Sequence, residues 1–181
     1  MGNKQSLKEL QERLARRLSA ARVEGSAGSW LAVESAGDRF LLPLVQSGEI
    51  FPWVSAQRVP YTKPWYQGVV SLRGGLWGVI DLAALLKEHR LYGSPENRAG
   101  ERSVSEARLI SLHPGLGVNA VLLVDRLLGL RNPSVFASRT EATEGAPSYY
   151  GQRLVDQDGL TWQELDMVSL CSQPAFLAIA A

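Results

Sequence analysis

Two carboxylates occupy similar positions in the two halves of the chain, which raises the question of acid–base chemistry. Asp81 precedes the apolar run LAALL, and Asp166 precedes MVSLC. Paired carboxylates can act as general acid and general base when a fold brings them together. An aspartate before an apolar helical run also accepts hydrogen bonds from the free N–H groups of the first turn. This position favours two structural N-caps over a catalytic pair.

Few other side chains could bind a metal or attack a substrate. His89, His113 and Cys171 are far apart in the sequence, and their spacing matches no metal-binding motif. The run RGGLWG at 73–78 lacks the lysine and the following helix of a phosphate-binding loop. A Cys–His dyad stays open, but the sequence predicts no catalytic residue, no metal and no cofactor.

Composition narrows the class of protein. The chain has 181 residues, of which 45% are hydrophobic and 20% charged, as in an ordinary globular protein. Its single cysteine, Cys171, excludes an internal disulfide and suits a reducing compartment. It has no secretory signal and no run of about 18 apolar residues, so we expect a cytoplasmic protein without direct membrane insertion. A net charge of +1 without a basic stripe argues against nucleic-acid binding.

Residues 1–28 are predicted to form an amphipathic helix followed by a linker. Ser6 and Glu9 form a capping-box pattern, and GSAGS at 25–29 ends the helical periodicity. The apolar stripe consists of Leu7, Leu10, Leu14 and Leu18. It packs on its own domain, docks on a partner helix, or swings free on the Gly/Ser linker.

From Trp30 onward, short apolar or alternating runs recur about every 8–12 residues, which is typical of an all-β barrel or sandwich. Short helices are predicted only near LAALLKEHR and DMVSLC, and polar loops at 92–105 and 137–148. The first of these loops is a natural joint between two halves. Residues 65–86 also resemble residues 149–171: each has an aromatic entry, a strand, a glycine turn, a strand with a tryptophan, and an aspartate opening a helix. The repeat predicts two pseudo-equivalent lobes.

The predicted hairpin GVVSLRGGLWGVIDL, residues 68–82, has one fixed charge at its tip. Gly74 and Gly75 permit positive φ, so the two strands can reverse in a tight turn. Such a turn would lift Arg73 out of the core on a rigid base. Its guanidinium would then face either a partner or a group of its own domain.

Three segments resemble the CheW family of chemotaxis adaptors: PWYQGVVSLRGGLWGVIDLAALL (64–86), FLLPLVQSGEIFP (40–52) and VNAVLLVDRLLGL (118–130). The hairpin and the C-terminal run are most similar to the PilI-type adaptors of type IV pilus (twitching motility) signalling. The resemblance implies an all-β, CheW-like domain over residues 29–181, made of two five-stranded β-barrel lobes. It also implies a non-catalytic adaptor with two partners, the cytoplasmic tip of a methyl-accepting chemoreceptor and the regulatory domain of a CheA-like histidine kinase.

The resemblance also suggests which residues meet each partner. Receptor contact is expected at Leu72, Arg73 and Gly74. Kinase contact is expected at Glu49, Gly68 and Leu130. The sequence departs from the family pattern at Ser71, where asparagine is common, and the second-half turn VDQDGL has no arginine.

The sequence also allows three other hypotheses about function. One is a coupling protein of a flagellar chemotaxis pathway, and another is a structural oligomerisation protein acting through the N-terminal leucines. A third is a small β-barrel enzyme or ligand binder, which would need a deep polar pocket containing His113, Cys171 or Asp125.

Overall fold

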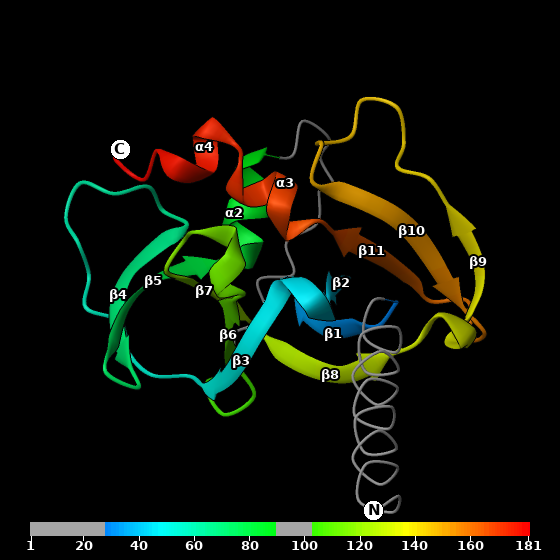
Figure 1. The fold of residues 1–181 in the computed structure, drawn as a ribbon, viewed down its shortest axis with the longest axis horizontal. Helices are drawn as coiled ribbons and strands as arrows, with labels where there is room; N and C mark the ends of the chain where they lie inside the picture. Colours follow the sequence, from blue (N-terminus) through cyan, green and yellow to red (C-terminus); the bar gives the residue numbers. More distant parts are fainter. Residues whose placement is uncertain (1–27, 90–102) are drawn as a thin grey trace, which may run out of the picture.

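The computed structural model describes residues 28–89 and 103–181. The predicted N-terminal helix lies outside these residues, as does most of the predicted loop at 92–105. The described chain forms two sheets that lie side by side, with short helices along one side of the molecule (Figure 1).

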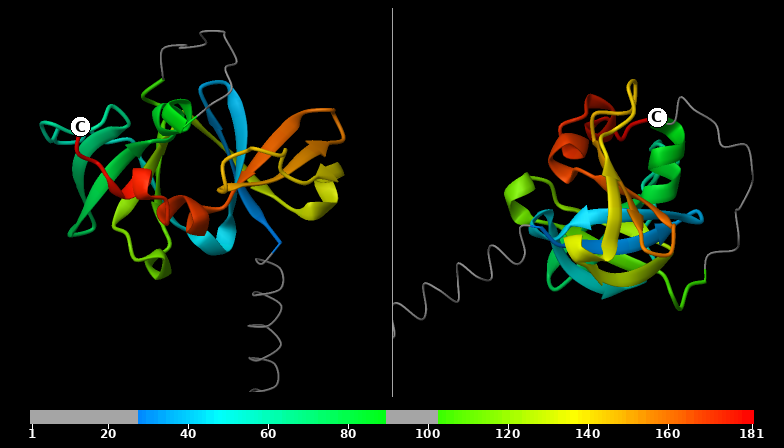
Figure 2. Two further views of the ribbon diagram at one scale, coloured as in Figure 1. Left: turned by 90° about the horizontal axis from the view of Figure 1, so that it is seen from above. Right: turned by 90° about the vertical axis from the view of Figure 1, so that its right-hand side faces the viewer.

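The first sheet has five strands and curls around its own core (Figure 2). Its strand order is β3 (Ser47–Pro52), β6 (Arg108–Leu112), β7 (Ala120–Val124), β5 (Gly75–Asp81) and β4 (Tyr66–Leu72). All neighbours are antiparallel except β5 and β7, which run parallel.

The second sheet has six strands rather than the five expected. Its order is β8 (Arg126–Arg131), β1 (Trp30–Ser35), β2 (Asp38–Pro43), β11 (Thr161–Leu165), β10 (Tyr150–Asp156) and β9 (Phe136–Thr140). The extra strand, β9, occupies part of the predicted polar loop at 137–148. Its last four residues are all exposed, so it carries no apolar alternation from which a strand could be predicted.

The expectation that each half of the chain builds its own lobe is wrong. Strands β1 and β2 from the N-terminal part join the sheet of the C-terminal hairpin, where β2 pairs in parallel with β11. Strands β6 and β7 from the C-terminal part join the sheet of the first hairpin. Each sheet therefore takes a central antiparallel pair from the other half of the sequence.

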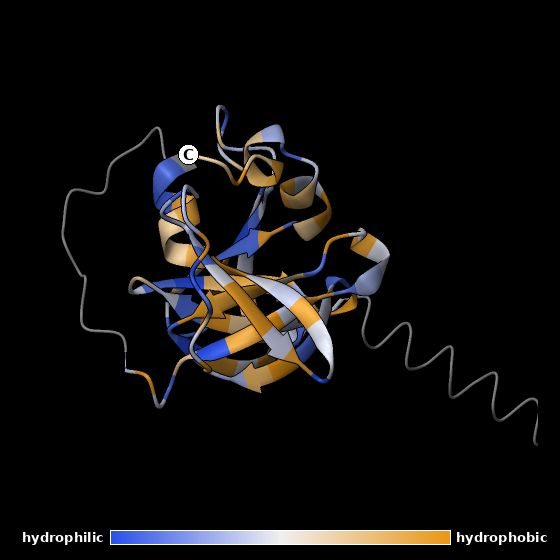
Figure 3. Ribbon diagram, turned by 90° about the vertical axis from the view of Figure 1, so that its left-hand side faces the viewer, coloured by the Kyte–Doolittle hydropathy of each residue, from blue (hydrophilic) through white to orange (hydrophobic). Residues whose placement is uncertain are grey.

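Three hydrophobic clusters follow from this exchange. One lies inside the five-stranded sheet and includes Val70, Leu72 and Leu109. A second lies inside the six-stranded sheet, around Trp30 and Trp162. The largest draws residues from both sheets and from the helices. Hydrophobic residues accordingly gather along the strands of the curled sheet (Figure 3). Because the shared cluster is the largest, the two sheets form one folded unit.

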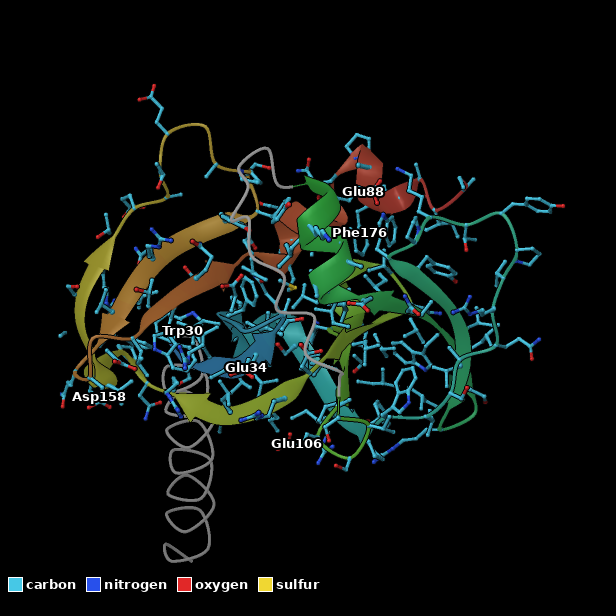
Figure 4. All side chains as sticks on the ribbon, turned by 180° about the vertical axis from the view of Figure 1, so that it is seen from behind. Trp30, Glu34, Glu88, Glu106, Asp158 and Phe176 are labelled. Atoms are coloured by element: carbon cyan, nitrogen blue, oxygen red, sulfur yellow. The ribbon has the colours of Figure 1, made fainter. Side chains whose placement is uncertain are left out.

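Short helices complete the fold: α2 (Leu82–His89), α3 (Met167–Cys171) and α4 (Pro174–Leu177), with 3₁₀ turns η1 (Leu44–Gln46), η2 (Pro114–Leu116) and η3 (Pro133–Val135). Arg126 on β8 lies 3.7 Å from a carboxylate oxygen of Glu34 on β1 and 3.7 Å from one of Glu106, just before β6 (Figure 4 labels both glutamates). This arginine links the two sheets at their boundary.

The predicted internal repeat is confirmed as two hairpin–helix units, β4–β5–α2 and β10–β11–α3. In the first unit the N–H of Asp81 donates to the carbonyl of Trp65 at 2.8 Å, and in the second the N–H of Asp166 donates to the carbonyl of Tyr149 at 2.8 Å. Both hairpins also contain a bulge near the start of their first strand. The same local sequence pattern thus produces the same local structure twice.

Candidate partner-binding surface

The β4–β5 turn has two central residues, Arg73 and Gly74, with Leu72 paired to Gly75. Their φ values are 47° and 78°. Of the two glycines, only Gly74 has a positive φ; the other left-handed residue of the turn is Arg73. Two successive left-handed residues match the twist of a two-residue hairpin. A non-glycine residue in this region costs about 1–2 kcal/mol, so the turn holds Arg73 in a strained conformation.

The Arg73 side chain points outward but has contacts within its own domain. Its Nε lies 3.0 Å from Oε2 of Glu49, and the side chains are 76% and 54% exposed. Its guanidinium carbon also lies 5.9 Å from the centre of the Phe51 ring. An ion pair this exposed contributes at most about 1 kcal/mol to stability. The guanidinium is therefore oriented by its neighbours yet accessible to another protein.

Glu49 reaches this position because β3 contains a bulge. Ser47 pairs with Leu112 and Ile50 with Ile110, so Gly48 and Glu49 both face Ser111. The N–H of Glu49 donates to the buried hydroxyl of Ser111 at 2.7 Å. A bulge bends a strand and redirects a side chain, here towards Arg73. A lone serine within the apolar run RLISL was the only sequence signal for this arrangement.

The Arg73–Glu49 contact links the β4–β5 turn to β3, and β3 and β4 are the two outer strands of the five-stranded sheet. The chain that follows β3 makes a second junction, because Gln57 and Val69 exchange both backbone hydrogen bonds, at 2.8 and 2.9 Å. We call this region, formed by Glu49, Phe51, Gln57, Val69 and Arg73, the seam. It brings together residues up to 24 positions apart and places a charged pair on the molecular surface.

Two of the predicted contact residues are buried. Leu72 is 8% exposed and packs inside the five-stranded sheet, so it supports the turn from below. Gly68 is buried with a φ of 124°, and a Cβ at this position would overlap the Gln57 carbonyl. Glycine at this position therefore admits a neighbouring backbone. The neighbour is the backbone at Gln57, within the same domain.

Leu130 lies on another part of the molecule, on the outer strand β8 of the six-stranded sheet, and its side chain is 59% exposed. The structure therefore brings Glu49 and Arg73 together but leaves Leu130 on a different sheet. Two exposed apolar residues that were not predicted, Ile50 and Leu76, are chain neighbours of Glu49 and of the turn.

The two aspartates are N-caps, as predicted. Asp81 accepts from the N–H of Ala84 at 3.2 Å, and Asp166 accepts from the N–H of Val168 at 3.1 Å. Burial by itself would raise the pKa of Asp166, but hydrogen bonds from Ser169, Gln46 and the backbone outweigh it and hold the pKa below its usual value. Both carboxylates are thus engaged in helix starts.

Three other side chains that were considered for catalysis are buried or hydrogen-bonded within the domain. Cys171 is buried, and burial, with the nearby Asp166 charge, raises the pKa of its thiol to about 11. His113 caps η2 by accepting from the N–H of Gly115 through Nδ1. Asp125 accepts from the N–H of Ala36 at 2.7 Å. Within residues 28–89 and 103–181, no group of three acidic, histidine or cysteine side chains is placed to hold a metal.

Among the helices in the described part of the chain, none has the length and apolar character needed to cross a bilayer.

Known proteins resemble this chain in fold and in sequence profile. No curated protein sequence matches the chain significantly. Among solved structures, the scaffolding protein TtCheW from Thermoanaerobacter tengcongensis superposes with a TM-score of 0.55 at 19% sequence identity, covering 77% of this chain and 88% of its own. A profile of the CheW-like domain matches residues 29–174, which include both sheets and the seam. The protein therefore belongs to the CheW-like domain family.

Proposed function

We propose that this protein is a non-catalytic adaptor that couples a methyl-accepting chemoreceptor to a CheA-like histidine kinase. The single observation that carries the proposal is the outward guanidinium of Arg73, held on a two-residue turn beside Glu49. A planar guanidinium on a rigid base can bind a carboxylate or a carbonyl with little ordering cost. Membership of a family of scaffold proteins supports the same reading.

The receptor tip is proposed to contact Arg73 and Gly74, with Leu72 supporting the turn from the core. A receptor carboxylate would compete with Glu49 for the guanidinium. Because the present pair is exposed, exchanging one carboxylate for another costs little. The receptor can therefore bind here without disturbing the packed interior.

The kinase regulatory domain is proposed to contact Glu49 directly and to depend on Gly68 indirectly, through the Gln57 backbone that this glycine admits. Leu130, exposed on the other sheet, is proposed as a second kinase contact. Glu49 lies 3.0 Å from Arg73, so the receptor and kinase assignments share an edge. Binding of one partner then changes the affinity for the other, and the coupling is reciprocal.

A three-component binding experiment tests the proposal. The purified protein is mixed with a CheA-like regulatory domain, with a receptor cytoplasmic fragment, and with both. We expect each partner to bind alone. We also expect the affinity for one partner to change when the other partner is already bound. If the folded protein binds neither partner, the adaptor function is wrong.

Within this function we propose the type IV pilus (twitching motility) pathway, with the protein in the cytoplasm and attached to receptor arrays through its partners. The similarity of the β4–β5 hairpin and the C-terminal run to PilI-type adaptors supports this assignment. Parallel titrations with a pilus-type and a flagellar-type receptor fragment decide between the pathways. Stronger binding to the flagellar fragment would favour the alternative, a flagellar coupling protein.

The leucine stripe of residues 7–18 favours one further candidate, a structural protein that oligomerises through its N-terminal segment. Removing residues 1–24 and measuring the mass in solution tests this candidate. A fall from oligomer to monomer, with partner binding absent from the full chain, would replace the adaptor proposal.

A further inference from the structure

The chain that follows α4 returns to the five-stranded sheet and pairs with the segment before β4. The N–H of Lys63 donates to the carbonyl of Ile179 at 2.9 Å, and the N–H of Ala181 donates to the carbonyl of Tyr61 at 3.0 Å. Thr62 and Ala180 are thus paired as in an antiparallel ladder. Two views show residues 178–181 beside the loop that leads into β4 (Figures 1 and 2). We call residues 178–181 the strap.

The strap is anchored in the shared core at its other end. Phe176 is 4% exposed, and its ring stacks on the fully buried Trp65 with a centroid distance of 6.2 Å and an interplanar angle of 8° (Figure 4 labels Phe176). The helices that precede the strap, α3 and α4, come directly from β11 of the six-stranded sheet. The segment from α3 through the strap therefore connects the six-stranded sheet to the loop of the five-stranded sheet.

The loop that receives the strap, residues 53–64, also has an ion pair with α2, between Lys63 and Glu88 at 3.2 Å. Most of its residues are exposed, and it contains no strand or helix of its own. Trp53 and Ala56 pack against the core of the five-stranded sheet, and Gln57 pairs with Val69. Beyond Gln57, the strap pairs with Tyr61 and Lys63. The loop is thus fixed at its beginning by the seam and near its end by the strap.

The pairing at Gln57 covers the outer edge of β4. Val69 both donates to and accepts from Gln57, and Gly68 is shaped to admit that backbone. If the loop left this position, the N–H and C=O of Val69 would become an open strand edge. The end of the loop is held by the buried Trp65 and by β4, and the strap adds a further attachment at Tyr61 and Lys63. A loop with this additional attachment has fewer conformations, so losing the strap favours detachment at Gln57.

We propose that the strap is a conformational device that keeps the loop 53–64 ordered over the β4 edge and thereby sets the affinity of this edge for the kinase. The effect on affinity rests on the proposed function, whereas the ordering of the loop does not. A loop ordered in advance spares the complex the entropy of ordering it on binding. Any partner that holds α3 or α4 would stabilise the same ordered state.

A pair of proline variants tests the strap in the full chain. Ala181→Pro removes the N–H that donates to Tyr61. Ala180→Pro is the matched control, because the pairing uses the N–H of Ala181 and the C=O of Ile179 but not the N–H of Ala180. Both changes suit an extended backbone. Hydrogen exchange is then followed at Lys63, Gln57 and Val69, with a core amide of β7 as the measure of intact folding.

With Ala181→Pro we expect hydrogen exchange to become about two- to tenfold faster at Lys63, Gln57 and Val69, because one hydrogen bond is lost. The exchange rate of the β7 amide should not change. The control should exchange as the original protein does. Faster exchange at Lys63 alone, with Gln57 and Val69 unchanged, would overturn the proposal, because the strap would then not act on the β4 edge. Equal acceleration by both variants would overturn it as well.

The kinase arm is measured separately on the same proteins. We expect the dissociation constant for the regulatory domain to rise about two- to tenfold for Ala181→Pro and to stay unchanged for Ala180→Pro. Equal affinity for all three proteins would overturn the link between strap and kinase. If the original protein does not bind the kinase, the proposed function fails, and the exchange data alone decide whether the strap orders the loop.

Discussion

Nε of Arg73 lies 3.0 Å from Oε2 of Glu49, and this contact links the β4–β5 turn to β3, an outer strand of the five-stranded sheet. The sequence separates the two residues by a strand end and an irregular loop. The bulge at Gly48–Glu49 and the left-handed turn at Arg73–Gly74 bring them together. The pair therefore depends on two backbone irregularities, the bulge in β3 and the left-handed turn between β4 and β5.

Replacing Arg73 by alanine should separate folding from binding. The exposed ion pair contributes at most about 1 kcal/mol, so the unfolding free energy should fall by no more than that. Receptor binding should weaken by about 1–3 kcal/mol if Arg73 is a hot spot of the interface. Denaturant unfolding and receptor titration measure the two effects. An unchanged dissociation constant would remove Arg73 from the proposed receptor contact.

Gly68 and Gly74 offer a matched pair of glycine-to-alanine changes. Both have positive φ, 124° and 78°, but only at Gly68 would a Cβ overlap another backbone, that of Gln57. Gly74→Ala should cost about 1–2 kcal/mol for the left-handed backbone alone. Gly68→Ala should cost more, about 2 kcal/mol or above, and accelerate hydrogen exchange at Val69. Similar costs at both positions would contradict the close approach of Gln57.

Ser111→Ala should destabilise the protein by about 1 kcal/mol, because it leaves the N–H of Glu49 without its acceptor beneath the bulge. The buried hydroxyl also fills the space opposite Gly48. Ser138→Ala, on the exposed strand β9, is the control and should leave stability unchanged. Equal unfolding midpoints for the two variants would show that Ser111 does not support the bulge.

Asp166→Asn should reduce the acid sensitivity of the fold. The pKa of Asp166 is lowered in the folded state, so its charge stabilises the protein above the unfolded pKa of about 3.9. This contribution is lost as pH falls from there through the folded pKa. Asparagine keeps an acceptor for the helix start but has no charge to lose. Unfolding curves should therefore differ near pH 6 and converge once the pH falls below the lowered pKa of Asp166. A constant difference across this range would contradict the assignment.

Local features of the fold could be predicted from the sequence. The apolar entry, strand, turn and aspartate of residues 65–86 and 149–171 each contain the information for a hairpin followed by a capped helix, and both form. The capping hydrogen bonds at Asp81 and Asp166 come from amides within three positions, although Gln46 also donates to Asp166 from another part of the chain. The tight turn at Arg73 was predicted from its glycines, but the two residues at its centre were not. Glycine at two successive positions permits either register, and the pairing of β4 with β5 selects one.

Long-range features could not be predicted. Strand β9 has no apolar alternation, and the bulge that redirects Glu49 depends on a hydroxyl 62 residues away. The close packing at Gly68 depends on an irregular loop that has no periodicity of its own.

By itself, the sequence determined the β class of the domain, the two hairpin–helix units and the charged turn between apolar strands, because backbone preferences and side-chain alternation act over a few residues. Only the tertiary structure decided that β1–β2 and β6–β7 exchange sheets, that one sheet has six strands, and that Arg73 faces Glu49. Strand partners are chosen by the apolar surface that the whole assembly buries and by the need to cover strand edges. Many strands of similar composition satisfy the local rules equally well, so the choice among them belongs to the complete fold.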